Sequence, residues 1–136
     1  MVFANTLQIL IYLDRAFNDR SIGTMQAEEP DLMGNVTAYI ENHYADHITV
    51  QDLSRRFFVS ESTISHQFKQ KMGISIYRYM TQRRLIAAKK LIAQALPLEQ
   101  VGSRVGFTDY SAFYRAFKQE YGISPRQYRT MLEHGK

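Results

Sequence analysis

The sequence predicts an all-α protein in which a long central helix joins two similar helical subdomains, with about seven helices and an extra helix at the N-terminus. Three observations support this fold class. Beyond residue 30, no run alternates apolar and polar residues with the period of two that is typical of strands. The apolar residues recur instead at helical spacing. In addition, a block near the middle of the chain is repeated near its end.

Residues 1–30 form the first predicted segment, an N-terminal helix followed by a linker. Apolar residues recur at helical spacing between residues 2 and 17. Residues 18–30 are polar and end at Pro30, which places the domain boundary there. The apolar stripe favours self-association, so a homodimer through residues 2–17 is one expectation. The alternative is a monomer in which this helix folds back on the rest of the chain.

Residues 31–136 are predicted to form one domain of seven helices with local start and stop signals. The expected ranges are about 31–44, 49–57, 61–72, 76–95, 97–105, 109–121 and 124–131. The expected N-terminal caps are Thr49 with Asp52, Ser75 and Ser124. The expected terminators are Gly73, Gly122 and Pro97, the last of which stops the long central helix.

Composition limits the function classes. The 136 residues include no cysteine, which excludes disulfides, a thiol nucleophile and a cysteine-based zinc site. Residues 1–30 carry two basic and four acidic side chains, whereas residues 31–136 carry 15 basic and nine acidic ones. This positive excess favours a nucleic-acid partner. No apolar run is long enough to span a membrane and no secretory signal is recognisable, so we expect a cytoplasmic protein.

The internal repeat is the most informative feature of the sequence. Residues 68–75 (FKQKMGIS) correspond to residues 117–124 (FKQEYGIS) at an offset of 49, and seven of the 12 positions from 68 to 79 match. Each copy consists of a helix, a short turn and a second helix in about 20 residues. This is the plan of a helix-turn-helix subdomain, whose second helix lies in the major groove.

The central helix sets the expected separation of the two copies. About 20 residues span roughly 30 Å, close to the roughly 34 Å between successive major-groove segments on one DNA face. The two recognition helices, about 61–72 and 109–121, are therefore expected to enter adjacent major-groove segments of double-stranded DNA. A monomer would then bind a bipartite site in a sequence-specific manner.

Side chains on the outward face of each recognition helix are the candidate base-reading residues. In the first copy Ile64 and Phe68 are expected to face the core. Phe113 and Phe117 take the equivalent places in the second copy. The outward residues are Ser62, Ser65, His66, Tyr110, Ser111, Tyr114 and Arg115.

Arg115 is the strongest of these candidates, because its guanidinium can bind guanine O6 and N7 together. A surface salt bridge with Asp109 or Glu120 is the alternative. His66 is either a base or phosphate ligand or a solvated surface residue. Tyr114 either contacts a phosphate or a thymine methyl group or simply packs on the surface.

Six basic residues are candidate phosphate contacts, which position a protein on DNA without reading sequence. They are Lys69, Lys118, Arg55, Arg56, Arg78 and Arg104. Lys69 and Lys118 occupy equivalent places in the two copies, each directly after a core phenylalanine. Alternatively, the four arginines are solvent-exposed surface residues that do not contact DNA.

Residues 31–136 resemble the AraC/XylS-type transcription activators. The resemblance rests on Arg84-Leu85 with Ala88 and on a run that begins at residues 105–109 (VGFTD) and continues through Phe113, Phe117-Lys118, Gly122, Ser124-Pro125 and Tyr128-Arg129. It implies the C-terminal DNA-binding domain of a transcription regulator, with RNA polymerase as a second partner. It also implies that residues 2–17 are the remnant of an upstream sensor and dimerisation domain.

Two positions depart from the family pattern. Ser54 and Gly102 stand where the family usually has alanine in the bracing helix of each copy. Gly102 is expected to weaken its helix by up to about 1 kcal/mol relative to alanine.

Two other function classes remain as alternatives. His43 and His47 have the spacing of metal ligands on a helix, but the glutamate of the zinc-protease motif and a third ligand are missing. No phosphate-binding loop or activated serine is recognisable, so no catalysis, metal or cofactor is expected. A protein-binding helical adaptor is the stronger rival, because amphipathic helices can present a groove to a partner.

Overall fold

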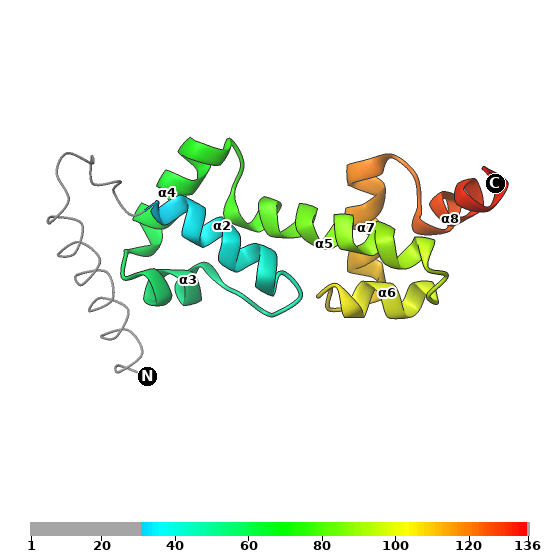
Figure 1. Cartoon of the computed structure of the whole chain (residues 1–136), viewed down its shortest axis with the longest axis horizontal. Helices are drawn as coiled ribbons and strands as arrows, with labels where there is room; N and C mark the ends of the chain where they lie inside the picture. The colour runs from blue at the N-terminus through cyan, green and yellow to red at the C-terminus, as the bar shows by residue number, and fades with distance from the viewer. Residues whose placement is uncertain (1–30, 136) are drawn as a thin grey trace, which may run out of the picture. The chain divides into compact units, whose positions relative to one another are not determined.

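A computed structural model of the chain describes residues 31–135, and these residues form seven α-helices and no strand (Figure 1). The helices are α2 (Leu32–His43), α3 (Val50–Phe57), α4 (Glu61–Met72), α5 (Ile76–Ala93), α6 (Leu98–Arg104), α7 (Tyr110–Tyr121) and α8 (Pro125–His134). The prediction of an all-α fold is confirmed for this part of the chain. The chain divides into two compact units, Met1–Leu32 and Met33–Lys136. The helix predicted at residues 2–17 lies outside the described residues.

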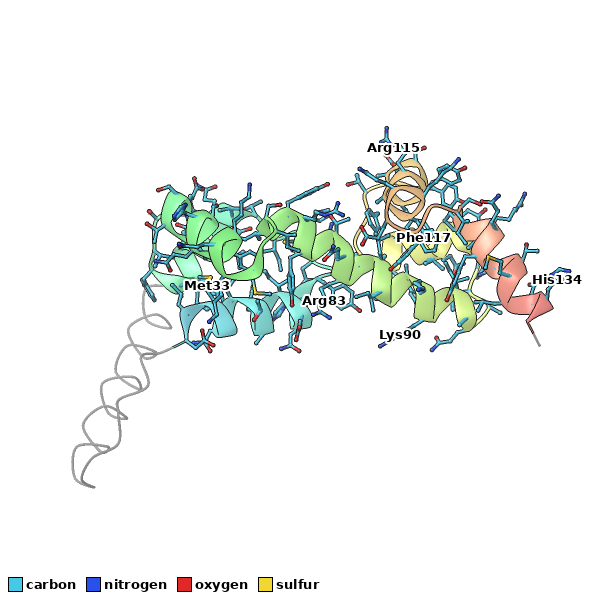
Figure 2. All side chains as sticks on the ribbon, turned by 90° about the horizontal axis from the view of Figure 1, so that it is seen from above. Met33, Arg83, Lys90, Arg115, Phe117 and His134 are labelled. Carbon is cyan, nitrogen blue, oxygen red and sulfur yellow. The ribbon has the colours of Figure 1, made fainter. Side chains whose placement is uncertain are left out.

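The second unit contains two helix-turn-helix modules with α5 between them. Helices α2, α3 and α4 form the first module, and α6, α7 and α8 form the second. In Figure 1, α3 and α6 lie on one side of α5, whereas the C-terminal ends of α4 and α7 lie on the other. Figure 2 shows α4 and α7 on the side of α5 opposite to α2. The recognition helices of both modules are therefore on the same side of the central helix.

The predicted N-terminal caps are present. The backbone N–H of Thr49 donates to Asp52 Oδ2 at 2.9 Å, and the Asp52 N–H donates to Thr49 Oγ1 at 3.1 Å. The bond from the Thr49 backbone, followed by the one from its hydroxyl, lowers the pKa of the Asp52 carboxyl. Ser75 and Ser124 each accept a backbone N–H at 3.1 Å. Pro125 occupies the first turn of α8.

The two copies of the repeat end in the same way. Gly73 and Gly122 both take a φ of +77°, and each donates its N–H to the carbonyl oxygen of the lysine four residues earlier, at 2.8 Å. Glycine adopts this left-handed conformation without the steric cost that a Cβ atom would bring. The repeated sequence thus encodes a repeated helix end.

The central helix ends two residues earlier than predicted. It extends to Ala93 and has 18 residues, which span about 27 Å. Ala95 has a φ of +64°, and the N–H of Leu96 donates to the carbonyl oxygen of Leu91 at 3.3 Å. This turn brings the side chain of Leu96 onto the buried cluster of the second module. The packing of Leu96 therefore ends the helix before Pro97 is reached.

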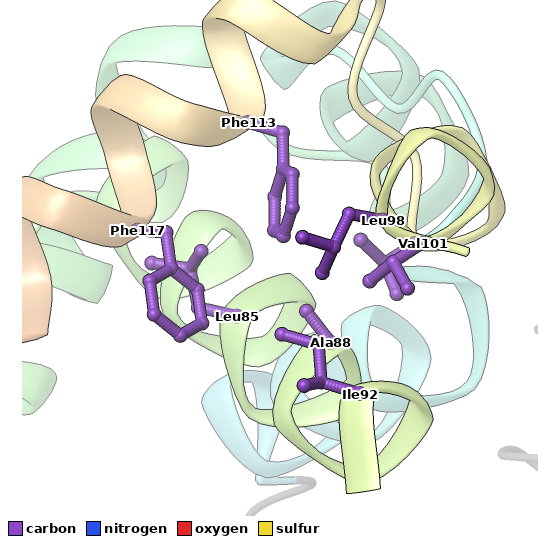
Figure 3. Packing of buried hydrophobic residues seen from close by; sticks show 8 residues of the cluster. Leu85, Ala88, Ile92, Leu98, Val101, Phe113 and Phe117 are labelled. Carbon is purple, nitrogen blue, oxygen red and sulfur yellow. The ribbon is translucent and has the colours of Figure 1, made fainter. Parts of the chain in front are cut away.

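Helix α5 contributes to the core of each module. Its first half buries Ile76, Tyr79 and Met80, and the ring of Tyr79 packs edge-on against that of Phe68 at 5.5 Å between centroids. Its second half belongs to a buried cluster around α6 and α7 (Figure 3). That cluster is made of Leu85, Ala88, Ile92, Leu98, Val101, Val105, Phe113 and Phe117. Phe57 of α3 is only partly buried.

The structure explains the glycine at position 102. Gly102 is buried, and a Cβ atom there would lie 2.9 Å from Cβ and 3.0 Å from Cγ of Phe113. These distances are shorter than a normal carbon–carbon contact of about 3.5–4.0 Å. The glycine lets α6 and α7 pack closely, and this packing opposes the gain in helix propensity that alanine would bring.

We therefore expect Gly102→Ala to lower the free energy of unfolding by about 1–3 kcal/mol, because the clash with Phe113 outweighs the gain in helix propensity. Urea denaturation monitored by circular dichroism measures this change. Ser103→Ala, at an exposed position of the same helix, is the control and should change stability by less than about 0.5 kcal/mol. A stabilised Gly102→Ala variant would contradict the packing interpretation.

Candidate nucleic-acid interface

The outward face of α4 carries the candidate residues of the first module. Ile64 and Phe68 are fully buried, as predicted from the spacing. Ser62, Ser65 and His66 are exposed, and so is Lys69. Ser62 and His66 line a shallow hollow together with Thr63 and Gln67. Helix α4 thus presents a polar face of short side chains to solvent.

The outward face of α7 is larger and more aromatic. Tyr110, Ser111 and Arg115 are exposed, and Tyr114 is partly buried. The ring of Tyr110 packs against Phe113 at 6.0 Å and against Tyr114 at 6.3 Å between centroids. Each tyrosine ring therefore packs against a neighbouring ring and remains partly accessible to solvent.

Arg115 projects from α7 into solvent. Figure 2 shows its side chain pointing away from α5, whereas Phe117 points towards α5. The two carboxylates considered as alternative partners are engaged elsewhere. Asp109 Oδ1 accepts the N–H of Ala112 at 2.7 Å, and Glu120 Oε2 lies 3.2 Å from Arg78 Nη2. In the described part of the chain, Arg115 has no ion-pair partner.

The candidate phosphate ligands divide into two groups. Lys69, Lys118, Arg55 and Arg104 are exposed and form no ion pair within residues 31–135. Arg56 and Arg78 make close intramolecular contacts, and Lys118 Nζ lies 5.9 Å from the centroid of the Tyr114 ring. The guanidinium carbon of Arg56 lies 4.2 Å from the centroid of the Tyr39 ring, and Arg78 pairs with Glu120.

Both recognition helices begin with a side-chain cap. Ser60 Oγ accepts the N–H of Thr63 at 3.1 Å before α4, and Asp109 takes this role before α7. A cap satisfies a backbone donor at the end of a helix and fixes where the first turn begins. The outward residues of each first turn are therefore held on an ordered helix.

Sequence reasoning missed several residues that shape this interface. Ser54 Oγ donates to the carbonyl oxygen of Val59 at 2.6 Å and closes the turn before α4, where Phe58 has a φ of +56°. The Arg84 guanidinium donates to backbone carbonyls of the α2–α3 loop, and its burial lowers its pKa. Ser54 was noticed only as a departure from alanine, and Arg84 only as part of a motif without a role.

The fold and its exposed second helices define a helix-turn-helix domain. A family profile described as a helix-turn-helix domain matches residues 53–131. This is more than half of the chain, and the curated and solved relatives include AraC-type proteins. The chain belongs to the AraC-type helix-turn-helix family.

Two curated relatives show how much of a longer protein this chain spans. The probable transcriptional regulator LumQ of Photobacterium leiognathi is 36% identical over 132 residues, which are 95% of this chain and 50% of LumQ. The arabinose operon regulatory protein of Salmonella typhimurium is 36% identical over 97 residues, which are 70% of this chain and 34% of that protein. The chain thus spans half or less of the length of these relatives.

Solved structures share the fold. The C-terminal domain of AraT, a response regulator from Geobacillus stearothermophilus, superposes on this chain with a TM-score of 0.72 at 29% identity. The match covers 77% of this chain and 88% of the AraT domain. The DNA-binding domain of the transcriptional factor AdpA, solved in complex with a target DNA, gives a TM-score of 0.74 at 23% identity. It covers 79% of this chain and 97% of that one.

Other kinds of site were also considered. Within residues 31–135, no group of three or more histidines and carboxylates is placed to hold a metal ion. His43 Nδ1 instead lies 3.0 Å from Asp46 Oδ2 at the surface. Across the same residues, no helix has both the length and the apolar character needed to cross a bilayer.

Removing the cap of α7 tests whether it orders the second recognition helix. We expect Asp109→Ala to lower the free energy of unfolding by about 1 kcal/mol, whereas Asp109→Ser should stay close to the wild type because serine is an equally good cap. Thermal unfolding of the two variants makes the comparison. Equal losses in both would show that the carboxylate stabilises the protein by a route other than capping.

Proposed function

We propose that this chain is the DNA-binding part of a transcription regulator and that α4 and α7 enter adjacent major-groove segments on one face of double-stranded DNA. The observation that carries the proposal is the placement of two capped, exposed recognition helices on the same side of α5. Buried recognition helices, or helices on opposite sides, would not allow one duplex to meet both.

The length of α5 can be compared with the distance between the two DNA segments that α4 and α7 would enter. Its roughly 27 Å is somewhat shorter than the roughly 34 Å between successive major-groove segments on one face of straight B-DNA. A DNA duplex that bends toward the protein brings these segments closer together. Bending costs free energy that depends on sequence, so base pairs between the half-sites contribute to specificity without being touched.

The two modules are proposed to read DNA unequally. Helix α7 offers Arg115, which is free to bind guanine O6 and N7 together, and Tyr110 and Tyr114, whose accessible ring edges can contact a thymine methyl group or a phosphate. Helix α4 offers the serines at 62 and 65, which serve several bases with little discrimination, and His66, which can contact a base edge or a phosphate. The stronger base preference is therefore expected in the α7 half-site.

We propose that the main phosphate contacts are made by the exposed basic residues that form no ion pair within the protein. Lys69 and Lys118 hold equivalent places on the two recognition helices, while Arg55 and Arg104 flank them on the bracing helices. Such contacts orient the protein and make affinity depend on salt. Arg56 and Arg78 would have to leave their intramolecular partners to join them.

Further partners are proposed on the basis of the family resemblance and the sequence. The resemblance supports RNA polymerase as a second partner of the complete regulator and the cytoplasm as its location. Homodimerisation through residues 2–17 is also proposed, on the basis of their apolar pattern. Sedimentation analysis of the chain with and without residues 1–30 tests the dimer.

Selection of bound sequences from a random pool of DNA duplexes tests the proposed function. The expected product is a bipartite site whose halves lie about 10–10.5 base pairs apart from centre to centre. Its gel-shift band should weaken steeply as salt is raised. Failure to enrich any sequence, together with salt-insensitive binding to a protein partner, would instead favour the helical adaptor.

Two variants separate base reading from phosphate binding. Arg115→Ala is expected to reduce discrimination at one base pair of the α7 half-site by about 1–3 kcal/mol. Lys118→Ala should weaken all sequences alike and make the slope of log affinity against log salt shallower by about 0.9. Titration of a panel of single-base-pair variants of the selected site measures both effects. Identical specificity profiles for the two variants would contradict this division of roles.

A further inference from the structure

The two modules touch each other beside α5. The α2–α3 loop of the first module lies against the α6–α7 turn of the second. A Cβ atom at Gly106 would lie 2.8 Å from the carbonyl oxygen of Ala45 and 2.9 Å from its Cα. Gly106 also has a φ of +106°, which glycine adopts far more readily than other residues. Tyr44 from the same loop packs against the buried cluster of the second module.

Arg84 of α5 joins these two segments. Its Nε donates to the carbonyl oxygen of Tyr44 at 2.6 Å, and its Nη2 donates to that of Asp46 at 3.0 Å. The same Nε lies 2.9 Å from the place of a Cβ atom at Gly106, and the guanidinium carbon is 5.9 Å from the centroid of the Phe107 ring. The guanidinium therefore binds the loop of one module while it packs on the turn of the other.

A second contact between the modules is weaker. Arg78 in the first turn of α5 pairs with Glu120 near the end of α7, at 3.2 Å. The side chain of Arg78 is 52% exposed, and exposed ion pairs contribute little to stability. Arg84 is half-buried, and its hydrogen bond to the partly buried carbonyl of Tyr44, made from a charged donor, contributes more. Of the two contacts, the one made by Arg84 is the stronger constraint.

We infer that Arg84 is a positioning residue which fixes the distance and angle between α4 and α7 and so restricts the half-site spacing that the protein accepts. Inserting one base pair between two half-sites moves them apart by about 3.4 Å and rotates them by about 36°. A rigid joint between the modules cannot follow this change unless the DNA twists or bends at a cost. The part of the inference that concerns DNA rests on the proposed function.

Duplexes with altered spacing test the effect on DNA. The selected site is compared with sites that have one base pair inserted or removed between its halves. The wild type should bind both altered sites at least about tenfold more weakly. Arg84→Met keeps the length of the side chain but removes its donors, and it should reduce this difference to less than about threefold.

Arg83→Met is the matched control. Arg83 Nη2 lies 3.0 Å from Glu41 Oε1 and its guanidinium carbon 5.0 Å from the centroid of the Tyr79 ring, so its contacts stay within the first module. The substitution removes the same charge from the neighbouring position of the same helix. It should keep the spacing preference of the wild type, because it leaves the contacts between the modules in place.

A measurement without DNA tests the joint itself. Because the chain has no cysteine, Gln70→Cys and Gln119→Cys can carry two spin labels at equivalent, exposed places on α4 and α7. Electron–electron double resonance should give a narrow distance distribution in the wild-type background and in Arg83→Met. The distribution should broaden clearly in Arg84→Met, while circular dichroism shows unchanged helix content.

The two measurements separate the possible failures. An unchanged distance distribution and an unchanged spacing preference in Arg84→Met would overturn the inference. A broadened distribution with an unchanged spacing preference would also overturn it, because the joint would then not govern the choice of DNA. If the wild type selects no DNA at all, the proposed function fails, and the role of Arg84 in half-site spacing fails with it. The spin-label distances would still show whether Arg84 holds the two modules together.

Discussion

The structure depends on one helix that is shared by two cores. The first half of α5 packs Ile76, Tyr79 and Met80 into one module, and its second half packs Leu85, Ala88 and Ile92 into the other. Side chains on a single helix keep a fixed separation and a fixed rotation relative to one another. The spacing of these apolar residues along 18 positions therefore sets the approximate separation and direction of the two recognition helices, and contacts between the modules, such as those of Arg84, act within this frame.

Each recognition helix divides its residues between packing and recognition in the same way. Buried apolar residues at helical spacing attach α4 and α7 to their modules, and caps with left-handed glycines define where the helices begin and end. The remaining positions face solvent and are less constrained by packing. They can differ between the two copies, which is why α4 presents serines and a histidine whereas α7 presents tyrosines and an arginine.

Local signals explain most of what the sequence predicted correctly. Caps, terminating glycines and apolar spacing act within a few residues, so five of the seven helices begin and end within one residue of the predicted positions, and the outward faces of α4 and α7 follow from them. Helix α5 ends two residues earlier than predicted, and α8 ends three residues later. The end of α5, the close approach at Gly102 and the contacts of Arg84 depend on residues far along the chain. Backbone carbonyls that accept from Arg84 have no side-chain signature at all. The partners of Arg78 and Arg56 are side chains, Glu120 and Tyr39, but they are distant in the sequence and no local pattern links them to the two arginines.

Hydroxyl-radical footprinting of the chain on its selected site tests the arrangement of the two recognition helices most directly. Each DNA strand should show two protected stretches whose centres lie about 10–10.5 base pairs apart, so that both fall on one face of the duplex. A single protected stretch, or two stretches offset by about half a helical turn, would contradict the arrangement, because the two helices would then not meet the same side of the DNA.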